Sequence, residues 1–270
     1  MRVIIEQDPD AVGNRAAAFI AELVRRKPQC VLGFATGETP GRAYEQLARL
    51  HRDEGLDFSQ ATAFVLDEFV GLGPMHPQSH RAFMQQRLFD QINLNPSRIY
   101  VPDGRALDFE GFCRLYEQRI SEVGGIDLQI LDVGSDGHIA FNEPGSSLGS
   151  RTRLKTLARE TIGDKAALFG GDENVPRLVV TMGVGTILES RRCLLVATGA
   201  GKAEVIRGAI EGPVTAQLTA SALQLHREVI AIVDEAAASQ LARRQYYAEV
   251  ERAQSLLETG QQRAPGSLTS

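Results

Sequence analysis

Short apolar runs alternate with amphipathic helical patterns along most of the chain, and this alternation restricts the fold more than any other feature. The runs CVLGFA (30–35), IDLQILDVG (126–134) and EVIAIVDE (228–235) each fit a buried strand. Between such runs, segments 10–26 and 108–123 carry apolar side chains at helical spacing. Strands that are apolar on both faces need helices on both faces. The sequence therefore predicts an α/β fold with a mostly parallel sheet and helices on both faces.

The length and composition are consistent with one domain. A chain of 270 residues with 43% hydrophobic residues can bury a large core. No linker or internal repeat interrupts the alternation, so we expect a single α/β domain over residues 1–258. Residues 259–270 are polar and rich in Gly, Pro and Ser, and we expect a flexible tail there.

Charge and targeting patterns exclude several classes of partner. The net charge is −5 and no Lys/Arg-rich run occurs, which argues against nucleic-acid binding. The start, MRVIIEQDPD, has no signal-peptide pattern, and no apolar run reaches the ~18 residues of a membrane span. The cysteines, Cys30, Cys113 and Cys193, form no CxxC or metal-ligand spacing. We expect a cytoplasmic protein that binds no membrane and needs no metal or cofactor.

Two strand ends combine glycines with groups that can bind an anion. Ligands of parallel sheets bind at the carboxyl ends of the strands. ATGETPG (35–41) leads from a strand into a helix, and free N–H groups at such a helix start can cradle a phosphate. In ATGAGK (197–202), Lys202 opens a helix, where a bound anion would offset its unfavourable position in the helix dipole. The alternative is that both segments are ordinary tight connections.

Two further strand ends carry acids and a histidine. The run ATAFVLDE (61–68) reads as one strand ending in Asp67 and Glu68, of which only one can face a cleft directly. GSDGHIAFNEPG (134–145) holds Asp136, His138 and Glu143 in one short loop. A carboxylate partner fixes the tautomer of a histidine and raises its basicity. A capping Asp and a loop His without a catalytic role remain the alternative. The four strand ends together favour general acid/base catalysis on a small phosphorylated molecule.

The chain closely resembles the glucosamine-6-phosphate deaminases, also called glucosamine-6-phosphate isomerases. The resemblance runs from about Leu32 to Asp234 and rests on LGFATGETP, FVLDEFVGL, HPQSHRAFM, GSDGHIAFNEPGSSLGSRTRLKTL and GAGKAEVIRGAIEG. The related 6-phosphogluconolactonases also have a DGH-type loop, but they do not continue as IAFNEP. The resemblance implies a modified Rossmann-like fold. It also implies metal-free conversion of α-D-glucosamine 6-phosphate and water to fructose 6-phosphate and ammonia.

The resemblance also implies roles for individual residues. Asp67 would move a proton between C2 and C1 through an enolamine. His138 would open the sugar ring, and Asp136 and Glu143 would hold and tune its imidazole. The residues implied to bind the sugar phosphate are Thr36, Gly37, Glu38, Thr39 and Lys202.

Three positions depart from the family pattern. Glu38 stands where Ser or Gly is usual, so its carboxylate must turn away from a bound phosphate. The segment KAALFGGDENVP lacks the usual phosphate-binding Arg, for which the nearby Lys165 is a candidate substitute. His80 stands where the family often has Tyr.

Regulation and substrate identity stay open at this level. Some family members are hexamers activated by N-acetylglucosamine 6-phosphate, and we expect a homo-oligomer here, with a hexamer as one option. The matching effector positions are Ser146, Ser147, Arg153 and Lys155, which could instead position a loop or a subunit contact. Other readings are a deaminase for galactosamine 6-phosphate, a 6-phosphogluconolactonase-like hydrolase or a non-catalytic sugar-phosphate sensor.

Overall fold

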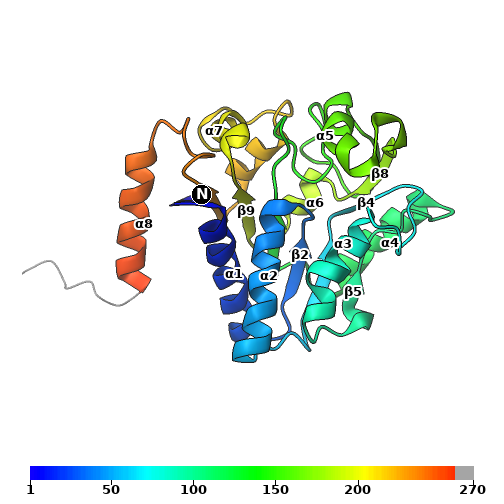
Figure 1. Ribbon diagram of the computed structural model, residues 1–270, viewed down its shortest axis with the longest axis horizontal. Helices are drawn as coiled ribbons and strands as arrows, with labels where there is room; N and C mark the ends of the chain where they lie inside the picture. The colour runs from blue at the N-terminus through cyan, green and yellow to red at the C-terminus, as the bar shows by residue number, and fades with distance from the viewer. Residues whose placement is uncertain (259–270) are drawn as a thin grey trace, which may run out of the picture.

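A seven-stranded parallel sheet forms the centre of the computed structural model, which describes residues 1–258 (Figure 1). Every neighbouring pair in this sheet is parallel, which confirms the α/β class expected from the alternation of strands and helices. The expected tail at 259–270 lies outside the described residues. In spatial order the strands are β1 (Arg2–Glu6), β10 (Val229–Asp234), β9 (Cys193–Ala197), β6 (Leu128–Leu131), β2 (Val31–Phe34), β3 (Thr62–Val65) and β5 (Ile99–Tyr100).

Helices cover both faces of this sheet. One apolar core packs α1 (Pro9–Arg26), α2 (Glu38–Glu54) and α3 (His80–Arg87) on one face. A second core packs α4 (Phe109–Glu122), α6 (Val184–Leu188) and α7 (Ala203–Glu211) on the other. Among the described residues, no helix is long and apolar enough to cross a membrane. Short 3₁₀ turns lie at Phe89–Gln91, Pro96–Arg98, Asp172–Asn174, Ala200–Lys202 and Thr219–Leu225.

The last described helix, α8 (Arg244–Glu258), lies beside the edge strand β1 (Figure 1). Arg2 on β1 pairs with Glu251 of α8 at 2.7 Å, and Arg15 of α1 reaches the same carboxylate at 2.6 Å. These ion pairs hold α8 against the β1 edge of the sheet.

A second, antiparallel sheet was not expected from the sequence. It consists of β4 (Asp67–Phe69), β8 (Leu178–Thr181) and β7 (Arg153–Thr156). The prediction of one strand over 61–68 is therefore wrong, because the chain leaves the parallel sheet after Val65. In the sequence, Asp67 and Glu68 look like the polar end of one strand, although both are buried and begin a strand of the second sheet.

Leu66 joins the two sheets. Its N–H donates to Phe34 O of β2 at 3.0 Å, and its carbonyl accepts from Met182 N, just after β8, at 2.8 Å. A small apolar core then packs α5 (Arg159–Phe169) against the second sheet. Asp67, the first residue of β4, is thereby placed above the ends of the parallel strands. This core contains Phe69, Phe141, Leu157, Ile162, Val175 and Val179.

The strand order also fixes where a ligand can bind. The chain runs from β2 outward to β3 and β5, whereas β6 is followed by β9 and β10 on the other side. The order reverses between β2 and β6, and open α/β sheets bind ligands at such a switch point. Both strands end there in the glycine-containing segments singled out from the sequence.

Candidate active site

A cleft lies at the switch point, between the carboxyl ends of β2 and β6 and the second sheet. It is bordered by side chains from six separate segments of the chain, so the fold is needed to assemble it. Its lining residues are Ala35, Thr36, Leu66, Asp67, His80, Asp132, Val133, Gly134, His138, Ala140, Phe141, Thr161, Asp164, Lys165 and Lys202.

The loop after β6 folds back on itself around His138. Gly134 N donates to His138 O at 2.8 Å, and Gly137 adopts φ +87°, which favours glycine. A Cβ on Gly134 would collide with the His138 imidazole, so the glycine permits the close approach expected from the sequence. Asp136 accepts the His138 backbone N–H at 3.0 Å. The loop thus presents the imidazole to the cleft.

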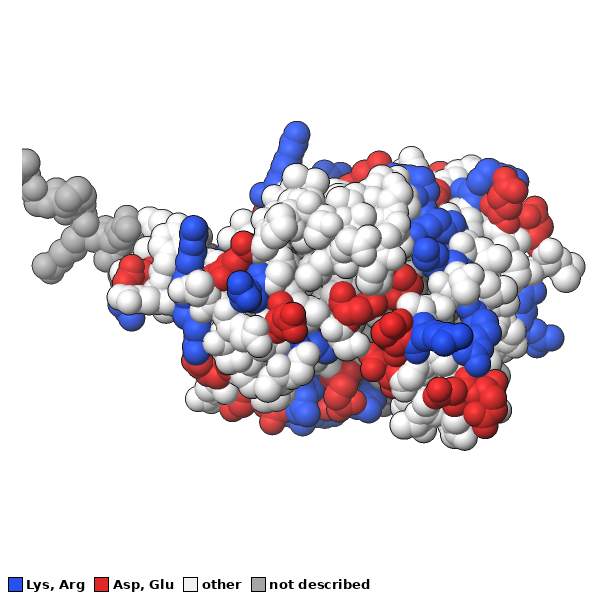
Figure 2. Space-filling view, turned by 90° about the horizontal axis from the view of Figure 1, so that it is seen from above, with Lys and Arg blue, Asp and Glu red and all other residues white. Residues whose placement is uncertain are grey.

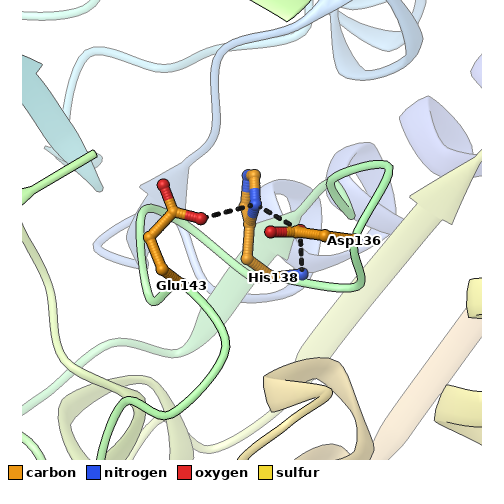
Figure 3. Close-up of side chains that lie close together, drawn as sticks. All are labelled: Asp136, His138 and Glu143. Atoms are coloured by element: carbon orange, nitrogen blue, oxygen red, sulfur yellow. Dashed lines mark hydrogen bonds and ion pairs between the residues drawn. The ribbon is translucent and has the colours of Figure 1, made fainter. Parts of the chain in front are cut away.

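Two acids flank that imidazole (Figure 3). His138 Nδ1 lies 2.6 Å from Oδ1 of Asp136 and 3.5 Å from Oε2 of Glu143. The contact has the distance of an ion pair but not the alignment of a directed hydrogen bond. Two further hydrogen bonds hold the Glu143 carboxylate in place, because it accepts Ala158 N at 3.1 Å and the Thr161 hydroxyl at 3.0 Å. The grouping expected from the sequence is therefore present.

The two acids differ in their electrostatics. Burial raises the pKa of Asp136, but the close contact and charge of the His138 imidazole, together with the hydrogen bond from the His138 backbone N–H, outweigh burial and lower that pKa to about 2. Burial raises the pKa of Glu143, and its hydrogen bond from Ala158 offsets this only in part. The shifts favour an ionised Asp136 beside the imidazole and a Glu143 that takes up a proton more readily.

The two adjacent acids of β4 have different surroundings and different hydrogen-bond partners. Glu68 accepts Phe69 N and His80 N through Oε1, at 2.8 and 3.0 Å, and Arg81 N through Oε2 at 3.0 Å. Its carboxylate thus caps the start of α3. Asp67 is 4% exposed, lines the cleft, and contacts the imidazole of His80. The cleft therefore receives one acid of the pair, as strand alternation requires.

Cations and a helix start lie at another part of the cleft. Thr36, Lys165 and Lys202 all line it, and Lys202 Nζ donates to Val133 O at 2.6 Å. Gly37 caps α2 with φ +140° and no side-chain hydrogen bond, which leaves the first N–H groups of the helix free of a side-chain cap. Asp132 lies near both lysines, and burial raises its pKa.

The other residues of the expected phosphate turn lie around this helix start. Glu38 is exposed and does not border the cleft, which is the outward orientation that a bound phosphate would require. Thr39 is buried, and its hydroxyl lies 2.9 Å from that of Thr198, at the end of β9. The two hydroxyls connect the turns after β2 and β9.

Comparison with known proteins identifies the family. The model of the glucosamine-6-phosphate isomerases and 6-phosphogluconolactonases matches residues 7–232. The chain belongs to this family. A glucosamine-6-phosphate deaminase of Arthrobacter sp. (strain FB24) is 49% identical over 92% of this chain and 95% of its own length. One from Cellvibrio japonicus (strain Ueda107) is 48% identical over 93% and 96%. The resemblance inferred from the motifs is therefore confirmed.

Solved structures of the isomerase/lactonase family support the same fold. A monomeric glucosamine-6-phosphate deaminase superposes with a TM-score of 0.87 at 42% identity, over 89% of this chain and 100% of that one. The 6-phosphogluconolactonase of Trypanosoma brucei gives a TM-score of 0.73 at 19% identity, over 89% and 98%. The second likeness concerns the fold alone.

Sequence reasoning missed two members of the site. The sequence shows His80 only as a departure from the family pattern. Its contact with Asp67 cannot be predicted from the sequence, because it depends on how α3 packs on β4. Asp132 lies within the apolar run 126–134 and was counted as part of a strand. An acid that interrupts such a run just before Gly134 was the available signal. Lys165, proposed as a substitute for an arginine, does border the cleft.

The four positions considered for an effector lie outside the cleft lining. Arg153 and Lys155 belong to β7, and Arg153 donates to Asn142 Oδ1 at 2.9 Å. Burial lowers the pKa of Arg153. Ser146 is buried, and its hydroxyl has no hydrogen-bond partner among the described residues, whereas Ser147 is exposed and accepts Gly149 N.

One group of side chains has the spacing of a metal site. Ligand atoms of Asp136, His138 and Glu143 lie within 4.8 Å of one another. The oxygens of Glu143 already accept Ala158 N and the Thr161 hydroxyl, and Asp136 already accepts His138 N. Because both carboxylates already accept hydrogen bonds from the protein, the group also fits a role in positioning the imidazole. The expectation of a metal-free site stays a prediction.

The lowered pKa of Asp136 predicts a specific pH dependence of stability. A folded pKa of about 2, below the ordinary 3.8, means that ionised Asp136 stabilises the fold above that range. This contribution is lost as pH falls toward 2. We expect Asp136→Asn to lower the free energy of unfolding at pH 6, with the difference from wild type shrinking below pH 4. Urea denaturation at several pH values measures it. The exposed Asp53→Asn serves as control, and a difference that does not change with pH would contradict the prediction.

Proposed function

We propose that this chain is a glucosamine-6-phosphate deaminase, which converts α-D-glucosamine 6-phosphate and water to fructose 6-phosphate and ammonia. The observation that carries the proposal is a single cleft lined by Asp67 and by an imidazole, His138, that two acids flank. The relatives of 48–49% identity and the related structure of 42% identity, all named for this activity, support it.

Ring opening is assigned to His138. The pyranose form must lose the proton of its anomeric hydroxyl and gain one at the ring oxygen. Histidine suits both transfers, because its unperturbed pKa lies nearest to neutrality. Asp136 holds the imidazole by charge, and Glu143, whose pKa is raised by burial, lies on its other side as a second proton-accepting group.

The step between the two carbons is assigned to Asp67. Its carboxylate takes the proton from C2 of the open-chain sugar, leaving an enolamine, and returns a proton to C1. The resulting imine at C2 adds water and releases ammonia, leaving the ketone of fructose 6-phosphate. Protons and electrons balance without an oxidant. Asp67 comes from β4 of the second sheet and His138 from the loop after β6 of the parallel sheet, so they approach a sugar in the cleft from different directions.

The phosphate is assigned to the cationic part of the cleft. The Thr36 hydroxyl, the uncapped start of α2 and the ammonium groups of Lys165 and Lys202 are the groups that an anion would contact. Gly37 and Thr39 shape this turn, and Glu38 contributes through its backbone while its side chain stays in solvent.

We further propose that an anionic effector binds near Arg153. The residue is half-buried with neutral partners, and Lys155 lies two residues along the same strand, on the same side. Ser146 and Ser147 supply hydroxyls from the loop that Arg153 reaches through Asn142. A sugar phosphate fits these groups. The homo-oligomer and cytoplasmic location remain predictions, and one related deaminase of known structure is described as monomeric.

The proposed activity is tested by ammonia release from a panel of substrates. We expect release from glucosamine 6-phosphate with equimolar fructose 6-phosphate, at an unchanged rate after dialysis against EDTA. Galactosamine 6-phosphate should react more slowly, and 6-phosphogluconolactone should not be hydrolysed above the background rate. Lactone hydrolysis without ammonia release would instead assign the lactonase activity of the family.

Removing the proposed base should separate binding from chemistry. Asp67→Asn keeps the shape of the side chain, so substrate binding should change little, whereas kcat should fall by about 10²–10⁴-fold, the usual contribution of a general base. Exchange of the C2 hydrogen with deuterated water, followed by NMR, measures the step directly. Native exchange in the variant would show that another group is the base.

The two cleft lysines should distinguish phosphorylated from unphosphorylated sugars. A charge-assisted hydrogen bond contributes about 1.5–3 kcal/mol, so Lys202→Ala and Lys165→Ala should each raise KM for glucosamine 6-phosphate about 10–100-fold. Unphosphorylated glucosamine should be little affected. Lys155→Ala, outside the cleft, is the matched control in the absence of effector. Equal losses with both sugars would argue against a phosphate site here.

A further inference from the structure

His80 lies against the carboxylate that the proposed mechanism uses as its base. Its Nδ1 is 2.7 Å from Oδ1 of Asp67 and 3.2 Å from the Asp67 backbone oxygen. A backbone carbonyl can only accept, so Nδ1 carries the proton and donates it. Both side chains are almost fully buried, at 9% and 6% exposure, and both border the cleft.

The surroundings fix the orientation of this imidazole. Glu68 and Ser79 cap the start of α3, where His80 is the first residue, so the backbone beneath the ring cannot easily shift. The ring stacks on Phe141, with centroids 5.8 Å apart, and meets Phe69 edge-on at 5.0 Å. Rotation of the ring would lose both aromatic contacts and the hydrogen bond together.

Asp67 is thereby held through one oxygen. Oδ1 takes the hydrogen bond from His80, whereas Oδ2 has no hydrogen-bond partner among the described residues. Oδ2 is not fully enclosed by the protein, so solvent or a ligand can reach it. One oxygen of the carboxylate is anchored and the other is available for a proton.

We propose that His80 is a positioning residue, which anchors Oδ1 of Asp67 so that Oδ2 is aimed at the C2 hydrogen of the sugar. This inference rests on the proposed function, since it assigns His80 a part in the proton transfer by Asp67. A carboxylate held at one oxygen keeps one lone pair in the productive direction, and a displacement of about 1 Å costs about 10²-fold in rate.

Charge adds a second effect. Burial opposes protonation of His80, but the charges of Asp67 and Glu68 outweigh it and raise the pKa of the imidazole above its ordinary 6.5. Lys165, on α5, acts in the opposite direction, and the remaining close neighbours, Phe69 and Phe141, are uncharged. An imidazolium stabilises the Asp67 carboxylate and weakens it as a base. The rate of proton transfer should therefore rise as the pH increases through the pKa of His80.

The test compares His80→Asn with His80→Phe. The Asn side-chain amide nitrogen lies close to where imidazole Nδ1 lies, so it can donate to Oδ1 but cannot ionise. Phe keeps the ring and its packing but has no donor. We expect His80→Phe to lower kcat and C2-hydrogen exchange about 10²-fold, with KM for glucosamine 6-phosphate changed less than about threefold. His80→Asn should recover most of the rate and lose the pH-dependent rise assigned to His80.

The outcomes separate this inference from the proposed function. A wild-type rate and pH profile in His80→Phe, or no recovery in His80→Asn with an unchanged melting temperature, would overturn the positioning role. If His80→Phe does not fold, the pH profile of His80→Asn decides, and an unchanged profile overturns the charge effect. If the wild-type enzyme releases no ammonia, the proposed function fails. ¹⁵N NMR of His80 then tests the contact alone: Nδ1 should carry the proton, and an unprotonated Nδ1 would contradict it.

Discussion

The two backbone hydrogen bonds of Leu66 determine where Asp67 lies relative to the cleft. One holds the residue against the end of β2 and the other against the end of β8, so the chain is fixed at the point where it changes sheets. Asp67 follows immediately, and its position above the parallel strands is therefore set by main-chain geometry. Because both bonds lie in a fully buried environment, losing either would leave an unpaired peptide group, at a cost of about 1–3 kcal/mol.

The acids around the cleft divide into two kinds according to their hydrogen bonds. Glu68 and Glu143 accept two or more donors each from the protein, so their carboxylates organise α3 and the loop that holds His138. Within residues 1–258, the Asp67 carboxylate accepts only the imidazole of His80 and keeps one oxygen available. The carboxylates with several donors hold the segments around the cleft in place, whereas Asp67 keeps an oxygen that can take up a proton.

The sequence predicts the parallel sheet and the His138 loop well, because both depend on local patterns. Apolar runs mark the strands, and Asp136, His138 and Glu143 come together within one turn whose glycines are visible in the sequence. It does not predict β4, since Asp67 and Glu68 look like the polar end of the preceding strand although both are buried. The pairing of His80 with Asp67 is also beyond local patterns, because it depends on the packing of α3 against the second sheet. Local chemistry can thus be read from the chain, whereas contacts between elements cannot.

Asp132 offsets part of the positive charge that Lys165 and Lys202 bring to the cleft. Burial raises the pKa of this carboxyl, while the charges of Lys202 and Lys165 act to lower it. The ionised Asp132 carboxylate would therefore be a counter-ion for both lysines. Its Oδ2 would lie only 2.7 Å from a Cβ on residue 37, and that residue has φ +140°, so only glycine fits the turn. A phosphate that approaches the lysines also approaches Asp132, and a like charge favours the protonated carboxyl. Binding of the proposed phosphate and proton uptake at Asp132 are therefore expected to be linked, since the same two ammonium groups serve both charges.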